Sequence, residues 1–186
     1  ENADGYFYIR STASLICNLK AISNYSDSKW KFIGAPTDTV NVVVGCTCHN
    51  FLVGFYLATV SYCSATRAST VSGTYGFQFC TAYNCYATNH AYGYYSSNAH
   101  SCAALSCTTG FRDCPVVTNC LARECTYGTD SAGARVRATA CIAHSCTNGF
   151  KNTTGNNLVA VGCSRAIYNG SYLKFAYYNC TTTVYQ

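Results

Sequence analysis

The stretch Cys141-Ile-Ala-His-Ser-Cys-Thr-Asn-Gly-Phe150 contains the pattern that recurs along most of this chain. A cysteine is followed two residues later by alanine, five residues later by a second cysteine, and then by a glycine-aromatic pair. The leading cysteines recur every 17 to 22 residues at Cys46, Cys63, Cys80, Cys102, Cys120, Cys141, Cys163 and Cys180. The second cysteines are Cys85, Cys107, Cys125 and Cys146. A period of this length is typical of one coil of a β-solenoid.

The Cys-x-Ala pairs indicate which side chains point inward. Residues i and i+2 of a strand share a face, and Cys and Ala are small and often buried, so both should fill a narrow interior. The second cysteine lies at an odd offset and reaches the interior only if the chain bends just before it. The residues at that point tolerate turns and are Asn84, Ser106, Glu124 and Ser145. The glycine of each glycine-aromatic pair is expected at a further corner with positive φ, and the aromatic is expected to begin the next strand facing inward.

The period therefore predicts an all-β fold, a right-handed parallel β-helix. Residues 46–186 should form its regular coils, whereas residues 1–45 have looser spacing and should form an N-terminal cap or irregular first coils. Differences in coil length are expected in loops at 87–99, 127–137 and 151–158. The chain has no initiator Met or signal-like start, which favours a processed form or a fragment. It ends on an open coil, so more protein or another subunit is expected to follow.

Composition and charge exclude several classes of function. Charged residues make up 10% of the chain, against about 25% in typical domains, and the net charge of +5 comes from scattered Lys and Arg. This scatter predicts neither nucleic-acid binding nor a polybasic membrane patch. No apolar run approaches the roughly 18 residues of a membrane span, so no membrane insertion is expected.

The fifteen cysteines are an odd number, include no CxxC pair and have no histidines at ligand spacing. We therefore expect no metal and no cofactor, and interpret the ladder as space-filling thiols. Disulfides between coils, such as Cys80–Cys102 or Cys125–Cys146, are a sterically allowed alternative in an oxidising environment.

Several segments carry a resemblance to a known family. Those segments are Asn84-Cys-Tyr-Ala-Thr88, Gly110-Phe-Arg-Asp-Cys114, Asn119-Cys-Leu-Ala-Arg-Glu-Cys125 and Cys141–Phe150. They resemble pectate-lyase-like parallel β-helix repeats, most closely the Cys/Asn-rich repeats of bacteriophage tail-fibre and tailspike proteins. The resemblance covers residues 80–186 well, 46–79 moderately and 1–45 hardly. It implies an elongated, trimeric virion protein that faces a receptor, and in some members cleavage of host polysaccharide.

Catalysis has weak candidates. A polysaccharide-cleaving site needs paired carboxylates, and the residues that qualify are Asp113 and Glu124 in successive coils. Solvated surface acids are the favoured interpretation of both. His144 lies between Cys141 and Cys146, but an inward thiol and an outward histidine should lie on opposite sides of the wall. Structural thiols are therefore favoured over a nucleophile.

Glycan binding has better candidates beside the predicted 87–99 loop. These are Tyr83, Tyr86, Asn89, His90, Tyr92, Tyr94 and Tyr95. Aromatic faces with neighbouring amides suit sugars, although cover of the solenoid or a subunit contact explains the tyrosines equally well. Sequons for N-glycosylation occur at Asn24, Asn152, Asn169 and Asn179.

We interpret the chain as a structural module of an extracellular assembly or virion, foremost a phage tail fibre or tailspike with possible host-glycan binding through side loops. The alternative is a subunit of a cell-surface filament or adhesin assembled by coil stacking, and the second alternative is a polysaccharide-degrading enzyme. The expected partners are further copies of the chain, as a trimer or an end-to-end polymer, and a cell-surface polysaccharide.

Overall fold

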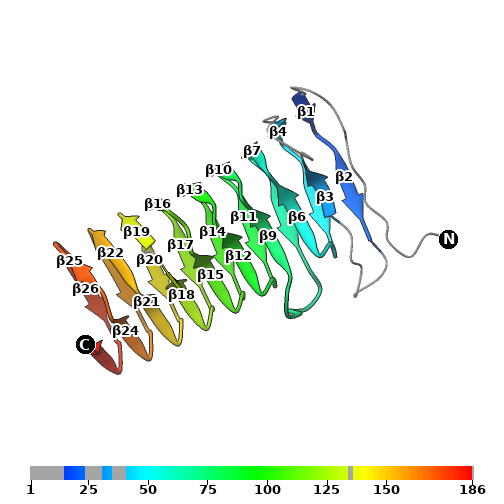
Figure 1. Cartoon of the computed structure of the whole chain (residues 1–186). Helices are drawn as coiled ribbons and strands as arrows, with labels where there is room; N and C mark the ends of the chain where they lie inside the picture. The colour runs from blue at the N-terminus through cyan, green and yellow to red at the C-terminus, as the bar shows by residue number, and fades with distance from the viewer. Residues whose placement is uncertain (1–14, 24–30, 35–40, 134–135, 186) are drawn as a thin grey trace.

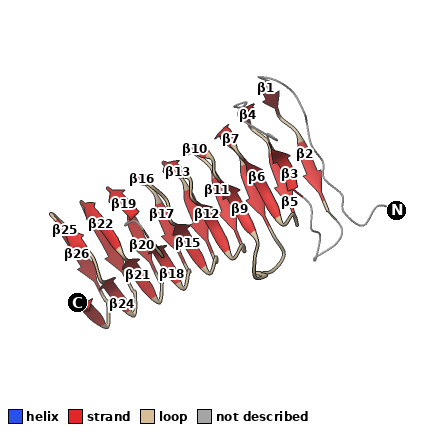
Figure 2. Cartoon of the chain, viewed as in Figure 1, coloured by secondary structure: helices blue, strands red, loops and turns tan. Residues whose placement is uncertain are grey.

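All regular structure in the described part of the chain is β-strand. The computed structural model describes residues 15–23, 31–34, 41–133 and 136–185, and its strands form three nine-stranded parallel sheets (Figures 1 and 2). None of the described segments forms a helix long and apolar enough to cross a bilayer. The predicted all-β parallel solenoid is thus confirmed.

The three sheets are named A, B and C in the order in which the chain visits them. Sheet A contains β1 (Leu15–Cys17), β4 (Asn41–Val44), β7 (Ala58–Ser61), β10 (Thr81–Tyr83), β13 (Asn98–His100), β16 (Val116–Thr118), β19 (Val136–Thr139), β22 (Thr153–Asn156) and β25 (Ser171–Tyr172). Sheet B contains β2 (Lys20–Ile22), β5 (Thr47–His49), β8 (Ser64–Thr66), β11 (Tyr86–Thr88), β14 (Ala103–Leu105), β17 (Leu121–Arg123), β20 (Ile142–His144), β23 (Leu158–Val161) and β26 (Phe175–Tyr178). Sheet C contains β3 (Lys31–Gly34), β6 (Val53–Tyr56), β9 (Tyr75–Gln78), β12 (Tyr92–Tyr95), β15 (Thr109–Arg112), β18 (Tyr127–Asp130), β21 (Asn148–Lys151), β24 (Arg165–Tyr168) and β27 (Thr182–Tyr185).

Each coil passes through sheets A, B and C and pairs in register with the coils on either side. In sheet B, for example, Ala87 lies between Ala65 and Ala104. The strands before residue 45 follow the same rule, because β1, β2 and β3 pair in parallel with β4, β5 and β6. The described strands of the amino-terminal part therefore belong to the same stack (Figure 1).

The corners are single residues in the left-handed backbone conformation. Asn84, Ser106, Glu124 and Ser145, where the sequence predicts bends, have φ of 52°, 50°, 57° and 52°. One such residue reverses the alternation of a strand, so the side chain that follows it points inward. The predicted corners at these four positions are confirmed.

The strand glycines follow a different rule from the predicted one. Gly76, Gly93 and Gly110 lie inside strands of sheet C and do not have positive φ, so the expectation of glycine corners was wrong. These positions require glycine because the interior of the solenoid is narrow there. A Cβ added to Gly93 would lie 2.7 Å from the Gly110 carbonyl oxygen and 2.9 Å from Ala104 Cβ. The alanine column of sheet B thus packs directly against the glycine column of sheet C.

The aromatic that follows each glycine faces inward, as predicted. Phe55, Phe77, Tyr94 and Phe111 are at most 1% exposed. Their rings stack from coil to coil with centroid distances of 5.0, 4.8 and 4.9 Å. This continuous apolar stack supplies the bulk of the core beside the small-residue columns.

Thirteen of the fifteen cysteines form three columns, one at each corner, and not the single ladder that the period suggests. Cys17 and Cys48 lie within strands β1 and β5. The corner between sheets A and B holds Cys46, Cys63, Cys85, Cys102, Cys120 and Cys141. The corner between sheets B and C holds Cys107, Cys125, Cys146, Cys163 and Cys180, and that between C and A holds Cys80 and Cys114. Cys80 and Cys102 therefore belong to different columns, so that predicted bridge pairs the wrong residues. All fifteen cysteines are free thiols in the structure.

The corner thiols bind the backbone as well as filling space. Cys120 Sγ lies 3.2 Å from the Thr118 carbonyl oxygen and 3.4 Å from that of Ala99, and it accepts the Cys102 N–H at 3.3 Å. Ser97 occupies the same kind of position, since its hydroxyl accepts the Cys80 N–H at 3.0 Å and donates to the Tyr95 carbonyl at 2.9 Å. A thiol or hydroxyl thus satisfies backbone groups where the sheets are interrupted.

We expect Cys120→Ser to keep most of the stability and Cys120→Ala to lose about 1–3 kcal/mol, because alanine leaves the Cys102 N–H and a corner carbonyl without a partner. Urea denaturation of both variants measures the difference in the free energy of unfolding. A pure space-filling role would give the reverse order, with the apolar alanine less damaging than serine.

Candidate functional site

The structure does not bring the seven predicted glycan-binding residues into one loop. The segment 87–99 is a regular part of the solenoid and not a loop, because it contains the end of β11, all of β12 and the start of β13. Tyr83 lies on the outer face of sheet A, Tyr86 on that of sheet B, and Tyr92 and Tyr95 on that of sheet C. The 151–158 segment likewise contains β22. The excursions from the solenoid among the described residues are at 67–74, between β8 and β9, and after Asp130.

Three of the seven residues serve the fold. Tyr94 and His90 are both 0% exposed, and Tyr94 belongs to the internal aromatic stack. Asn89 is a corner residue with φ of 58°, and its side-chain Nδ2 donates to the Arg67 carbonyl at 2.8 Å. Direct contact of Tyr94 or His90 with a surface ligand is therefore excluded in this structure.

Several of the outward tyrosines stack on neighbouring side chains. Tyr75 and Tyr92 stack at 5.2 Å between centroids, and the Arg112 guanidinium lies over the Tyr92 ring at 5.4 Å. Tyr83 stacks on His100 at 5.0 Å. Because a sugar packs its apolar side on a free ring face, these stacked rings offer little to a glycan. They form side-chain ladders that reinforce neighbouring coils.

The two catalytic candidates lie at different corners. Asp113 follows β15 at the corner between sheets C and A, whereas Glu124 follows β17 at the corner between sheets B and C. Asp113 Oδ1 accepts hydrogen bonds from the Ser131 hydroxyl at 2.9 Å and the Ala132 N–H at 2.7 Å. Glu124 pairs with Arg123 at 3.0 Å on the surface. The two carboxylates do not share a groove, which was the condition for paired-acid catalysis.

The sequence did not indicate that a third acid, Asp130, is the centre of a buried cluster of charges. Asp130 has a side chain only 5% exposed and forms ion pairs with Arg112 at 3.5 Å and Lys151 at 3.3 Å. Burial of a carboxylate requires such partners, and the three charges lie in successive strands of sheet C. This cluster ties β15, β18 and β21 together at the start of the excursion after Asp130.

The histidine and thiol candidates for nucleophilic chemistry are separated by the wall. His144 bonds with the Ser145 hydroxyl at 3.0 Å outside, whereas Cys141 and Cys146 are buried. The hydrogen bond with the Cys125 thiol, together with burial, raises the pKa of Cys146 to about 12, so this thiol stays protonated at neutral pH. Within the described residues, no three His, Cys, Asp or Glu side chains converge as a metal site.

Of the four sequons, Asn24 lies outside the described residues, and the other three are corner residues with positive φ. The Asn152 amide donates to the Ser131 carbonyl at 2.7 Å, and the Asn169 amide donates to Asn152 Oδ1 at 2.9 Å. Both amides are therefore occupied in corner hydrogen bonds. Asn179 is exposed.

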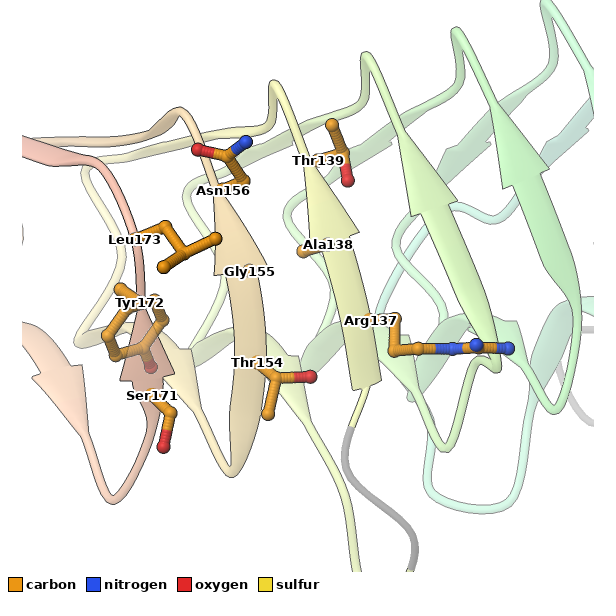
Figure 3. A pocket seen from close by; sticks show the side chains of 9 residues that line it. All are labelled: Arg137, Ala138, Thr139, Thr154, Gly155, Asn156, Ser171, Tyr172 and Leu173. Atoms are coloured by element: carbon orange, nitrogen blue, oxygen red, sulfur yellow. The ribbon is translucent and has the colours of Figure 1, made fainter.

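A shallow groove of about 380 Å³ crosses the outer face of sheet A (Figure 3). It runs over β19, β22 and β25 and is lined by Arg137, Ala138, Thr139, Thr154, Gly155, Asn156, Ser171, Tyr172 and Leu173. Thr154 lies between Arg137 and Ser171 in register. Figure 3 shows Tyr172 and Leu173 on one side of the groove and Arg137 on the other. Sequence reasoning missed this groove because its residues come from three coils.

No protein-family model matches the chain, and a search of curated proteins finds no match. The fold class of parallel β-solenoid rests on the sheet topology alone.

Proposed function

We propose that this chain is a structural module of an elongated extracellular assembly, a rigid shaft of the tail-fibre or tailspike type. The observation that carries the proposal is the continuity of the stack: all three sheets run from the first coil to the last without a break. Nine coils at about 4.8 Å give a column roughly 38 Å long. Within it, backbone hydrogen bonds join each coil to its neighbours, and columns of thiols and of stacked aromatic rings add contacts between many of the coils.

Assembly with further copies of the chain is part of this proposal. Leu121, Ile142 and Val159 follow one another in register on the outer face of sheet B, and Ile142 is 43% exposed. A row of apolar side chains on neighbouring strands supports a contact with another protein surface better than scattered single residues would. Side-by-side packing of identical shafts would cover it.

Saccharide contact is the second part of the proposal, and the groove on sheet A is the surface that supports it best. Hydroxyl and amide side chains line it, and an apolar pair stands at its edge. The rings of Tyr92 and Tyr83 are instead stacked on neighbouring side chains. The polysaccharide-degrading alternative has no supporting observation, because Asp113 and Glu124 lie at separate corners.

Immunogold electron microscopy tests the architectural role. Antibodies raised against the folded chain are applied to intact cells and to particles released by the organism that encodes it. We expect gold label on thin fibres or spikes of virions or of the cell surface. Label confined to the cytosol would contradict the proposal, and label on uniform cell-surface polymers would favour the filament alternative.

A further inference from the structure

The outer face of sheet B carries an apolar row that is longer than the three residues already described. Its strands, from β11 to β26, are neighbours along the solenoid (Figure 1). Six consecutive coils place an apolar side chain at the same outward position: Tyr86, Ala103, Leu121, Ile142, Val159 and Ala176. None of the six is buried, and Tyr86 and Ile142 are 38% and 43% exposed. A continuous row of this kind indicates contact with another protein surface.

A second outward column lies two residues further along each strand and is polar in the two middle coils. Arg123 and His144 are neighbours there in register. Arg123 pairs with Glu124 at 3.0 Å, and His144 bonds with the Ser145 hydroxyl at 3.0 Å. In these coils the polar groups therefore lie on one side of the apolar row, toward the corner between sheets B and C.

We infer that two copies of this chain pack through sheet B with their solenoid axes antiparallel. The two-fold axis runs along the strand direction, over the midpoint between β17 and β20. The inference deepens the assembly part of the proposed function and rests on it. Such an axis places each column on the same column of the second copy and reverses the order of the coils. The row then meets itself in three kinds of contact across the axis: Leu121 with Ile142, Ala103 with Val159 and Tyr86 with Ala176.

The polar groups favour the same arrangement. Arg123 and Glu124 of one copy face His144 and Ser145 of the second copy, so that imidazole and hydroxyl donors meet a carboxylate acceptor. Arg123 and Glu124 also cancel each other's charge, so two chains of net charge +5 meet little repulsion at this surface.

A two-fold axis along the solenoid, which makes the two copies parallel, matches the surfaces less well. The two columns then exchange places, and Leu121 of each copy faces Arg123 of the other. A guanidinium that loses water against an apolar side chain costs free energy. The antiparallel arrangement avoids this cost because apolar residues face apolar residues and polar residues face polar residues.

The area of the contact predicts how tightly the copies associate. Six coils at about 4.8 Å span roughly 29 Å, and a strand of three residues covers about 10 Å. The projected area is thus roughly 290 Å² per copy, against about 800 Å² per partner in a stable complex. We therefore expect a reversible dimer that forms at high protein concentration.

Analytical ultracentrifugation under reducing conditions tests the contact, from about 10 µM to about 1 mM protein because a contact of this area is weak. We expect a monomer–dimer equilibrium. Ile142→Asp should weaken the dimer about tenfold or more, since the axis places an unpaired carboxylate against each Leu121. Val116→Asp adds the same charge to the outer face of sheet A and should dimerise as the parent does. Equal dissociation constants for the two variants, or a parent that stays monomeric or forms trimers, would overturn the inference.

Photo-cross-linking tests the direction of the two axes in the parent background, with p-benzoylphenylalanine in place of Tyr86. Trypsin, which cleaves after Lys and Arg, leaves the probe in peptide 68–112 and Ala176 in peptide 175–186. We expect the covalent dimer to contain these two peptides joined. Within one copy the two positions lie five coil spacings apart, about 24 Å, so the link reports on two copies. Peptide 68–112 joined to its own copy would establish parallel axes and contradict the inference. Antibody labelling of fibres does not depend on this contact, so the shaft proposal is judged separately.

Discussion

Gly93→Ala is expected to lose about 3 kcal/mol or more of the free energy of unfolding, although it adds one methyl group. The new Cβ would lie 2.7 Å from the Gly110 carbonyl oxygen and 2.9 Å from Ala104 Cβ. Gly110 lies in β15 and Ala104 lies in β14, and each of these strands is hydrogen-bonded to a neighbouring strand on both of its edges. Neither strand can therefore move without breaking hydrogen bonds of its sheet. Urea denaturation followed by circular dichroism measures the change.

Gly133→Ala is the matched control, because an added Cβ there meets no atom within 4 Å. It should change the free energy of unfolding by no more than about 0.5 kcal/mol. Equal effects of the two substitutions would show that the narrow interior between sheets B and C is not what demands glycine.

Acid is expected to destabilise the protein through His90 as the pH falls from about 6.5 toward 3. Burial, together with smaller effects of the nearby Arg67 and His49, lowers the pKa of His90 from 6.5 to about 3. Neither ring nitrogen has a hydrogen bond of good geometry in the described part, and the Ala65 carbonyl compensates only partly. The folded state therefore holds the neutral ring. The free energy of unfolding is not reduced by this histidine at pH values above about 6.5, where the ring is neutral in the unfolded chain as well. Below that pH, His90 is protonated in the unfolded chain but not in the folded protein, which lowers the free energy of unfolding by up to about 5 kcal/mol.

His90→Cys tests this account, because Cys107 occupies the equivalent corner of the next coil. The parent should lose far more of its melting temperature between pH 7.5 and pH 4.5 than the variant does. The slope with pH is the informative quantity, since the smaller side chain also changes the packing at pH 7.5. Parallel slopes for parent and variant would locate the acid sensitivity elsewhere.

The period of the cysteines was sufficient to predict the solenoid and its main corners, because side-chain alternation and a polar residue before each second cysteine have direct structural meaning. The period alone was insufficient to assign each cysteine to one of the three corner columns. Cys80 and Cys85 belong to one coil but to different corners, and only the backbone register distinguishes them. The predicted loop at 87–99 was wrong because single left-handed residues, Asn89 and Ser96, turn the chain without extra length.

The candidate site was less predictable for a related reason. Arg137, Thr154 and Ser171 are about 17 residues apart in sequence but adjacent across strands. A run of aromatics such as Tyr92–Tyr95 is conspicuous in the sequence, whereas stacking of their rings on neighbours appears only in three dimensions. The excursion at 67–74 had a local signal in Ser69, Ser72 and Gly73, which favour turns.

The hydrogen bonds of each corner thiol to the coils beside it have a consequence for how such a chain changes length over evolution. A duplication or deletion of one complete coil leaves every remaining thiol, glycine and ring opposite an equivalent partner. A change of a few residues within a strand shifts all later side chains out of their columns. Natural variants should therefore differ by whole multiples of a coil, with smaller insertions confined to excursions such as 67–74.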